Sequence, residues 1–156
     1  MKRTEIKQLF SAPQDFDGAE TTVCGWVRTI RDSKAIGFIE LNDGSAFKNL
    51  QVILEQGTLS NFSEIVKLNV GSAITVHGRV VLTPEAKQPL EIHAESVEVE
   101  GLSTPDYPLQ KKRHSLEFLR SIAHLRPRTN TFEAVFRVRS VAAFAIHKFF
   151  NERGFV

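Results

Sequence analysis

An aromatic ring and an amide lie on two neighbouring apolar runs, at positions whose side chains should point outward. Ile39 and Leu41 have the spacing of core-facing residues in a strand, so Phe38 falls on the opposite face. By the same alternation, Gln51 lies on the outward face of the following run. An exposed ring supplies stacking worth about 1–3 kcal/mol to a flat base, and an amide both donates and accepts hydrogen bonds. The pair could therefore hold one unpaired nucleic-acid base.

Three charged residues could complete such a site. Arg28 and Arg31 precede Phe38 and carry guanidinium groups that can reach phosphates or base edges. Glu91 alternates with apolar neighbours and could accept a hydrogen bond from a base amine. The alternative is that Phe38 packs against a loop and that the charged groups are ordinary solvated residues, since single exposed apolar residues are normal.

Other kinds of chemistry have no support in the sequence. No spacing of His, Cys, Asp and Glu matches a metal site, so we predict no metal. The sequence also has no phosphate-binding glycine loop and no nucleophile elbow.

Five strand-like runs and two short helical patterns should position these residues. The predicted strands are Thr21–Arg31, Gly37–Asn42, Leu50–Leu54, Ala73–Leu82 and Leu90–Glu100. Helices are predicted around Thr4–Phe10 and in Ser60–Leu68. Gly25 marks a bulge or bend in the first strand, and a change of parity in the last predicts a bulge near Ser96. Three strands, a helix and two strands match the five-stranded OB-fold barrel, although SH3-like and other small β folds also use short strands.

Composition places the chain among soluble globular proteins, with 42% hydrophobic and 24% charged residues among 156. The longest apolar stretch, Val141 to Ile146, is far shorter than the roughly 20 residues of a bilayer helix, so we expect no membrane partner. The single cysteine, Cys24, excludes an internal disulfide and suits a reducing compartment, so we expect a cytoplasmic protein.

Charge divides the chain into two segments. Residues 1–102 carry 10 Lys+Arg against 14 Asp+Glu, whereas residues 103–156 carry 10 against 4. We predict an OB-fold domain over 1–102, a proline-containing linker over 103–114 and the start of a second domain over 115–156. Helices are predicted at Ser115–Leu125 and from Thr131 onward. The second is apolar around most of its circumference, so it should meet a larger domain or a second subunit.

Several ordered motifs resemble those of class II aminoacyl-tRNA synthetases of the Asp/Asn/Lys subgroup, and some resemble the bacterial asparaginyl enzymes in particular. The subgroup motifs are Gly25-Trp26-Val27-Arg28, Arg31-Asp32-Ser33-Lys34-Ala35, Gly37-Phe38-Ile39, Asn42-Asp43-Gly44-Ser45 and Gln51-Val52. The asparaginyl motifs are Lys112-Arg113-His114-Ser115 and Ala123-His124-Leu125-Arg126-Pro127-Arg128-Thr129-Asn130. The resemblance covers essentially the whole chain.

This resemblance implies that the barrel binds the anticodon stem-loop of tRNA(Asn). Phe38 would stack on the middle anticodon base, a uridine, whose edge Gln51 and Arg28 would read. Glu91 matches an acid that contacts an outer anticodon base. Arg31 belongs to the same expected surface.

The resemblance also implies a homodimer. Residues Phe136 to Val156 look like the first class-defining motif, a long helix at the dimer interface, and place Phe136, Ser140, Phe144 and His147 there. A full-length parent would join asparagine to its tRNA with ATP and Mg²⁺. Because the second and third motifs are absent from the sequence, we expect no cofactor and no catalysis in this N-terminal fragment.

Two rival hypotheses remain open at this point. The chain could be a free-standing single-strand-binding OB protein, which would choose weakly among bases. It could also be a synthetase-like paralogue with another role.

Overall fold

The structure is a computed structural model that describes residues 3–86 and 88–156. It divides into two compact units, Met1–Lys112 and Arg113–Val156.

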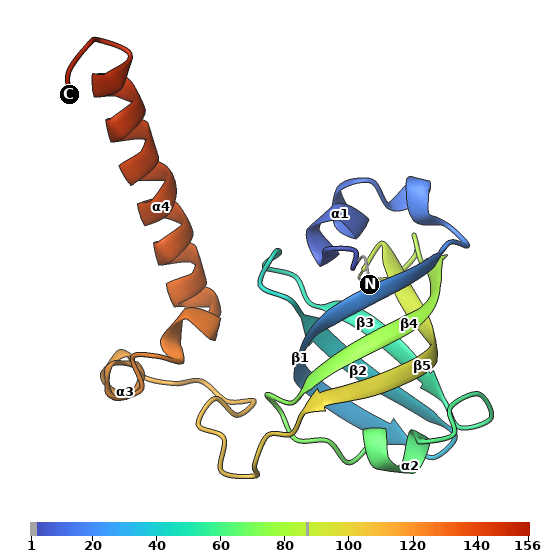
Figure 1. The fold of residues 1–156 in the computed structure, drawn as a ribbon. Coiled ribbons are helices and arrows are strands. Elements are labelled where there is room, and N and C mark those ends of the chain that lie inside the picture. Colours follow the sequence, from blue (N-terminus) through green and yellow to red (C-terminus); the bar gives the residue numbers. More distant parts are fainter. Residues whose placement is uncertain (1–2, 87) are drawn as a thin grey trace. The chain divides into compact units, whose positions relative to one another are not determined.

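The first unit is a closed five-stranded barrel with strand order β1-β2-β3-β5-β4, as Figure 1 shows. Its strands are β1 (Glu20–Ser33), β2 (Ile36–Asn42), β3 (Leu50–Glu55), β4 (Ala73–Leu82) and β5 (Leu90–Gly101). All neighbouring pairs are antiparallel except β3 and β5, which run parallel. The OB-fold prediction is therefore confirmed, with strand ends within two residues of the predicted ones.

Alternating apolar side chains fill the barrel, as period-2 patterning requires. Leu50, Val52 and Leu54 of β3 are fully buried, and so are Ile39 and Leu41 of β2. Helix α1 (Ile6–Ser11) lies at one end of the barrel and α2 (Phe62–Ile65) at the other (Figure 1). A 3₁₀ turn, η1 (Pro13–Phe16), follows α1. Both helices contribute buried residues to the core.

Strand β1 contains a bulge at Arg28, between the pairs Val27↔Leu41 and Thr29↔Glu40. The register has no shift at Gly25, so the bulge that was one of the two predicted irregularities there lies three residues further along. A Cβ atom on Gly25 would lie 2.7 Å from the Asn42 carbonyl oxygen, so the glycine permits a close approach of β1 to β2.

The predicted bulge in β5 is confirmed. His77 pairs with Ser96 and Gly78 pairs with Ala94, which leaves Glu95 as the extra residue. Gly78 is required there, because a Cβ atom would lie 2.1 Å from the carbonyl oxygen of His93.

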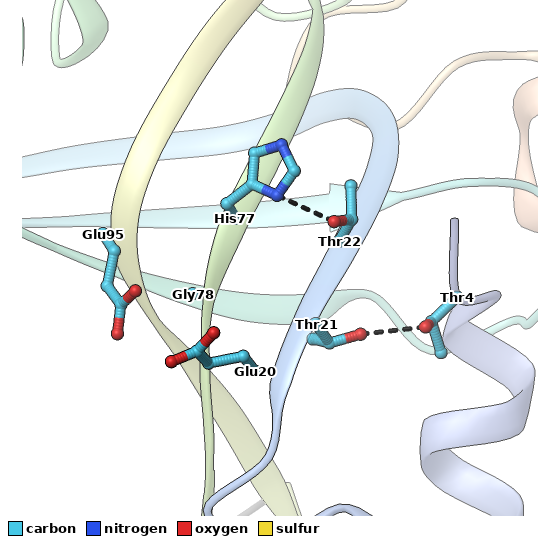
Figure 2. Close-up of a pocket in the computed structure, with 7 residues that line it drawn as sticks. All are labelled: Thr4, Glu20, Thr21, Thr22, His77, Gly78 and Glu95. Carbon is cyan, nitrogen blue, oxygen red and sulfur yellow. Dashed lines mark hydrogen bonds between the residues drawn. The ribbon is translucent and has the colours of Figure 1, made fainter. Parts of the chain in front are cut away.

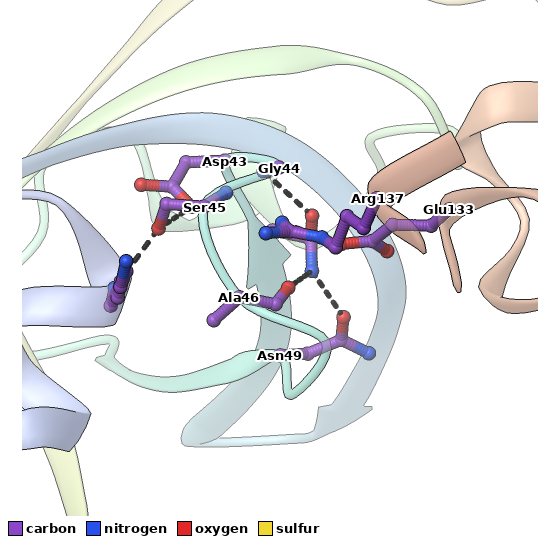
Figure 3. A network of polar contacts seen from close by, with 9 residues as sticks. Asp43, Gly44, Ser45, Ala46, Asn49, Glu133 and Arg137 are labelled. Carbon is purple, nitrogen blue, oxygen red and sulfur yellow. Dashed lines mark hydrogen bonds and ion pairs between the residues drawn. The ribbon is translucent and has the colours of Figure 1, made fainter. Parts of the chain in front are cut away.

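The loop between β2 and β3 connects to α1 through Asp43. One carboxylate oxygen accepts a hydrogen bond from the Ile6 backbone N–H at 2.9 Å. The other accepts from the backbone N–H and the hydroxyl of Ser45, at 2.9 and 2.6 Å (Figure 3). The hydroxyl oxygen of Ser45 in turn accepts from the backbone N–H of Lys7 at 2.9 Å. The loop thus supplies acceptors to the first turn of α1, whose N–H groups lack helical partners.

The segment predicted as a linker, 103–114, falls mainly within the barrel unit. The ring of Tyr107 packs against Gly71, so closely that a Cβ atom on Gly71 would lie 2.9 Å from the nearest ring atom. Leu109 is buried. Ser103 exchanges hydrogen bonds with the loop before β4, donating to Ser72 at 3.1 Å and accepting from Asn69 at 2.9 Å. Residues 103–112 therefore extend the barrel surface.

The second unit consists of helices α3 (Leu116–Ser121) and α4 (Asn130–Asn151), joined through a 3₁₀ turn, η2 (Arg126–Arg128). Ser115 caps α3 by accepting a hydrogen bond from the Phe118 N–H at 3.2 Å. The pKa of the Glu117 carboxyl in the first turn is lowered, chiefly by its own backbone N–H and then by the Ser115 hydroxyl. Within the described residues, no helix is both long and apolar enough to span a bilayer.

Candidate nucleic-acid interface

The ring of Phe38 is half-buried on the outer surface of the barrel. It sits in the middle of β2, between its register partners Arg31 on β1 and Ile53 on β3. Ile39, the next residue, is fully buried inside the barrel. The structure therefore places this ring outside the core, as the alternation predicted.

Arg31 shares the face of Phe38 because of the β1 bulge. In a regular strand Val27 and Arg31 would point to the same side, and Val27 is fully buried. The extra residue at position 28 reverses the alternation, so that Ile30 packs against the core and Arg31 lies opposite Phe38. The Arg31 guanidinium carbon lies 5.3 Å from the centroid of the Phe38 ring.

The Arg31 guanidinium partly covers the ring on which a base would stack. A base sandwiched between the two would need about 7 Å, which is twice the ordinary contact distance between flat groups. The observed 5.3 Å is too short for that. A base that stacks on this face of Phe38 must therefore displace Arg31, whose exposed side chain is then able to reach a phosphate.

Gln51 lies beside the ring along the neighbouring strand. It pairs with Glu40 on β2, while Phe38 pairs with Ile53, so Phe38 and Gln51 are diagonal neighbours on one face, about 7–8 Å apart. The backbone N–H of Gln51 donates to the side-chain oxygen of Gln88 at 3.2 Å. The structure thus brings the predicted ring and amide together.

Glu91 contacts the amide directly. The parallel β3–β5 pairing puts Glu91 next to Gln51, and Nε2 of Gln51 donates to Oε2 of Glu91 at 3.0 Å. Oε1 of Glu91 lies 3.0 Å from Nε2 of His93, and Nδ1 of His93 lies 3.8 Å from Oε1 of Glu55. The four side chains form a chain across β3 and β5, which we call the Gln51–Glu55 network.

Glu55 and His93 are the two residues of this network that were not predicted as site residues from the sequence, and His93 is the one that links the two carboxylates. The alternation of β5 shows that His93 points outward. Its contact with Glu55, however, depends on which residue of β3 lies beside His93. That register belongs to a parallel pair whose members are 40 residues apart, Ile53 and His93. Local patterns do not specify such a register.

Arg28 occupies the bulge itself and has no register partner on β2. Its side chain is half-buried. A bulge takes a residue out of the regular alternation and redirects its side chain. The strand pairing therefore does not align Arg28 with Phe38 or Gln51, although Arg28 is only three residues before Arg31.

A second polar network borders this face at the β2–β3 loop, which Figure 3 shows. The Asn42 side-chain nitrogen donates to the Ala46 carbonyl at 3.1 Å and to Oδ1 of Asn49 at 3.0 Å. Asn49 donates in turn to Oε2 of Glu40 at 3.1 Å. The amide oxygen of Asn42 accepts from the Gly44 N–H at 2.8 Å, which fixes the turn.

A polar cavity of about 310 Å³ lies elsewhere on the barrel, on β1, β4 and β5 (Figure 2). It is lined by Thr4, Glu20, Thr21, Thr22, His77, Gly78 and Glu95. The Thr22 hydroxyl and Nδ1 of His77 are 2.7 Å apart, and the Thr4 and Thr21 hydroxyls are 2.9 Å apart. Its two carboxylates would repel phosphate, so this cavity is a poor nucleic-acid site.

The four residues predicted at a dimer interface form one stripe along α4. Phe136, Ser140, Phe144 and His147 are separated by four, four and three residues, the spacing of a single helix face. All four are exposed, and Phe144 is 69% exposed. Near the start of α4, Arg126 lies over the Phe132 ring at 4.8 Å.

Within residues 3–86 and 88–156, no three or more His, Cys, Asp or Glu side chains are grouped so that they could hold a metal ion.

A family model described as "OB-fold nucleic acid binding domain" matches residues 21–100. These residues cover the five strands, except the first residue of β1 and the last of β5, together with α2. They include Phe38, Gln51 and Glu91.

Curated relatives match the chain along its whole length. An asparagine–tRNA ligase of Acetivibrio thermocellus is 68% identical over 156 residues, and one of Alkaliphilus oremlandii is 62% identical over 156 residues. In both cases the match covers 100% of this chain but 34% of the relative. The chain thus spans about a third of the length of these relatives.

Solved structures share the fold at lower identity. An asparaginyl-tRNA synthetase from Pyrococcus horikoshii, complexed with asparaginyl-adenylate, matches with a TM-score of 0.86 and 22% identity, covering 99% of this chain and 35% of that one. An aspartyl-tRNA synthetase from Entamoeba histolytica matches with a TM-score of 0.84 and 22% identity, covering 100% and 38%. An OBody bound to hen egg-white lysozyme matches with a TM-score of 0.55 and 21% identity, covering 66% of this chain and 99% of that one.

Proposed function

Since this chain belongs to the family of OB-fold nucleic acid binding domains, we propose that its barrel binds the anticodon stem-loop of tRNA(Asn). The relatives reported above are asparagine–tRNA ligases, whose name describes the joining of asparagine to tRNA.

One observation carries the proposal. Phe38 lies outside the core on β2, with the Gln51 amide as its diagonal neighbour on β3 and the Arg31 guanidinium over its ring. A flat ring beside a group that both donates and accepts hydrogen bonds suits a single unstacked base. This face of strands 2 and 3 is also where OB folds bind oligonucleotides.

Recognition would proceed in three physical steps. The central base of the loop leaves its stack, displaces Arg31 and lies on the Phe38 ring. The Gln51 amide then bonds to the edge of that base, which the family resemblance gives as uridine. Arg31, released from the ring, pairs with a nearby phosphate, and Arg28 supplies a second cation from the bulge.

We further propose that the activity of the full-length relatives extends to the protein to which this barrel belongs. That protein would attach asparagine to tRNA(Asn) using ATP and Mg²⁺. No residue of this chain is assigned to either cofactor, and on this proposal the chain contributes binding and orientation of the tRNA. Such a protein would work in the cytoplasm, where tRNA is used in translation.

A homodimer through α4 completes the proposal. The stripe of Phe136, Ser140, Phe144 and His147 is exposed. Exposed apolar patches that include large side chains such as Phe136 and Phe144 commonly mark protein–protein interfaces. Sedimentation of Phe144→Glu should show a shift toward monomer relative to the unmodified chain. If both forms sediment identically as dimers, this stripe is not the interface.

Titration against four anticodon hairpins tests the central proposal. The hairpins share one sequence except at the middle anticodon position, which carries U, C, A or G. We expect the U hairpin to bind at least tenfold more tightly than the C hairpin. Equal affinity for all four would favour a free-standing single-strand binder, because stacking and charge alone do not choose among bases.

A further inference from the structure

We propose that Glu91 and His93 are positioning residues that hold the Gln51 amide oxygen toward the bound base, so that the site selects uridine over cytidine. This inference rests on the proposed anticodon function. It assigns Glu91 a role inside the protein, which differs from the direct base contact that the family resemblance implies.

The orientation of the amide follows from its partner. An ionised carboxylate can only accept hydrogen bonds, so the group of Gln51 that faces Glu91 must be the NH₂. Nε2 of Gln51 lies 3.0 Å from Oε2 of Glu91. The amide oxygen therefore points away from Glu91. A second carboxylate, Glu40, adjoins Gln51 on the other side, but its Oε2 accepts from Asn49 instead.

Glu91 is itself held in place. Its Oε1 is 3.0 Å from Nε2 of His93, and its side chain is only 19% exposed. The Gln51–Glu91 contact depends on the parallel β3–β5 register, whereas Glu91 and His93 are two residues apart on one face of β5. The backbone of Gln51 is fixed as well, by its hydrogen bond to Gln88. The amide is therefore anchored at its backbone, and one of its two polar atoms has a fixed partner.

A fixed amide oxygen that faces N3 of the base distinguishes the two pyrimidines at that atom. Uridine carries a proton on N3, which can donate to that oxygen, whereas N3 of cytidine carries a lone pair that would face it. Both bases stack on Phe38 equally well, because stacking does not depend on that atom. The ring would thus supply affinity and the oriented amide would supply the choice between U and C.

The variant Glu91→Gln tests this directly. A glutamine at position 91 can present either its NH₂ or its oxygen to Gln51, so the Gln51 amide is free to turn over. We expect the ratio of U-hairpin to C-hairpin affinity to fall by about tenfold. His93→Ala, which removes the contact to Oε1 of Glu91, should lower the same ratio by a smaller factor.

Two control variants separate this role from others. Glu98→Gln makes the same chemical change at an exposed position of β5 and should leave the U/C ratio unchanged. Phe38→Ala should weaken binding of both hairpins by similar factors and keep the ratio. His93 has a side chain that is 41% exposed, so its replacement tests the idea even if Glu91→Gln folds poorly.

The outcomes distinguish this inference from the proposed function. If the unmodified chain prefers U and both variants keep the full U/C ratio, the positioning role is wrong while the proposed function stands. If Glu91→Gln instead changes selectivity at an outer anticodon position, Glu91 reads that base itself. If the unmodified chain shows no U preference, the proposed function fails first and the inference fails with it.

Discussion

Replacing Phe38 with alanine should weaken RNA binding while leaving the barrel folded. The bound base gains about 1–3 kcal/mol from stacking on an aromatic ring. It must first displace the Arg31 guanidinium, 5.3 Å from the ring centroid, and lose a cation–π contact worth about 0.5–1 kcal/mol. The net loss in Phe38→Ala should therefore be about 1–2 kcal/mol, which is about 5- to 30-fold in Kd.

The stability of the same variant should fall only modestly. Phe38 is half-buried on the outside of the barrel, so truncation leaves no internal cavity. We expect the free energy of unfolding to decrease by about 1 kcal/mol, a small part of the total for a domain. Urea unfolding and hairpin titration on the same preparation would measure both quantities.

The salt dependence of RNA binding provides a second test of the stacking role of Phe38. Because the ring carries no charge, the slope of log K against log salt should be the same in Phe38→Ala as in the unmodified chain. Phe155→Ala, a truncation at a ring that is 63% exposed outside the barrel, serves as the matched control and should bind normally. Unchanged affinity in Phe38→Ala, or an equal loss in Phe155→Ala, would refute the stacking role of Phe38.

Three further substitutions test other parts of the account. Arg31→Ala should reduce the magnitude of the salt slope by about 0.7, because the guanidinium displaced from the ring would contact one phosphate of a single strand. Asp43→Ala should lower the free energy of unfolding by about 1–2 kcal/mol, measured in urea, because it removes the acceptor of the Ile6 N–H at 2.9 Å. Gly78→Ala should lower it by about 3 kcal/mol, again in urea, because the new Cβ would collide with the His93 carbonyl 2.1 Å away.

Matched controls accompany the two stability predictions. Asp17→Ala removes an exposed carboxylate and should leave the unfolding midpoint unchanged. Gly57→Ala adds a Cβ atom with no other atom within 4 Å and should be neutral or nearly so. If Gly78→Ala unfolds at the same urea concentration as Gly57→Ala, the close approach of β4 to β5 is not a constraint. A normal midpoint in Asp43→Ala would show that the loop does not stabilise α1.

Alternation along single strands was enough to predict most of the barrel. The period-2 pattern of β4 gave its bounds, Ala73–Leu82, and the change of parity in β5 located a bulge near Ser96. The bulge in β1 was misplaced at Gly25. A better signal was present, since Val27 and Ile30 are both apolar but have opposite parity, which requires an extra residue between them.

The candidate site was predictable only as far as local patterns reach. The outward positions of Phe38 and Gln51 follow from their own strands. The contact between Gln51 and Glu91 depends on a parallel register between β3 and β5, which no local pattern specifies. Likewise, the packing of Tyr107 against Gly71 could not be read from a segment whose prolines are typical of a linker.

The most direct test of the account is to observe which nucleotide contacts Phe38. An NMR experiment on the chain bound to the U hairpin would measure nuclear Overhauser effects between the Phe38 ring protons and the H5 and H6 protons of each pyrimidine. We expect cross-peaks to the central uridine, together with a slowly exchanging N3 imino proton on that base. Cross-peaks from Phe38 to another nucleotide only, or none to the RNA, would contradict it.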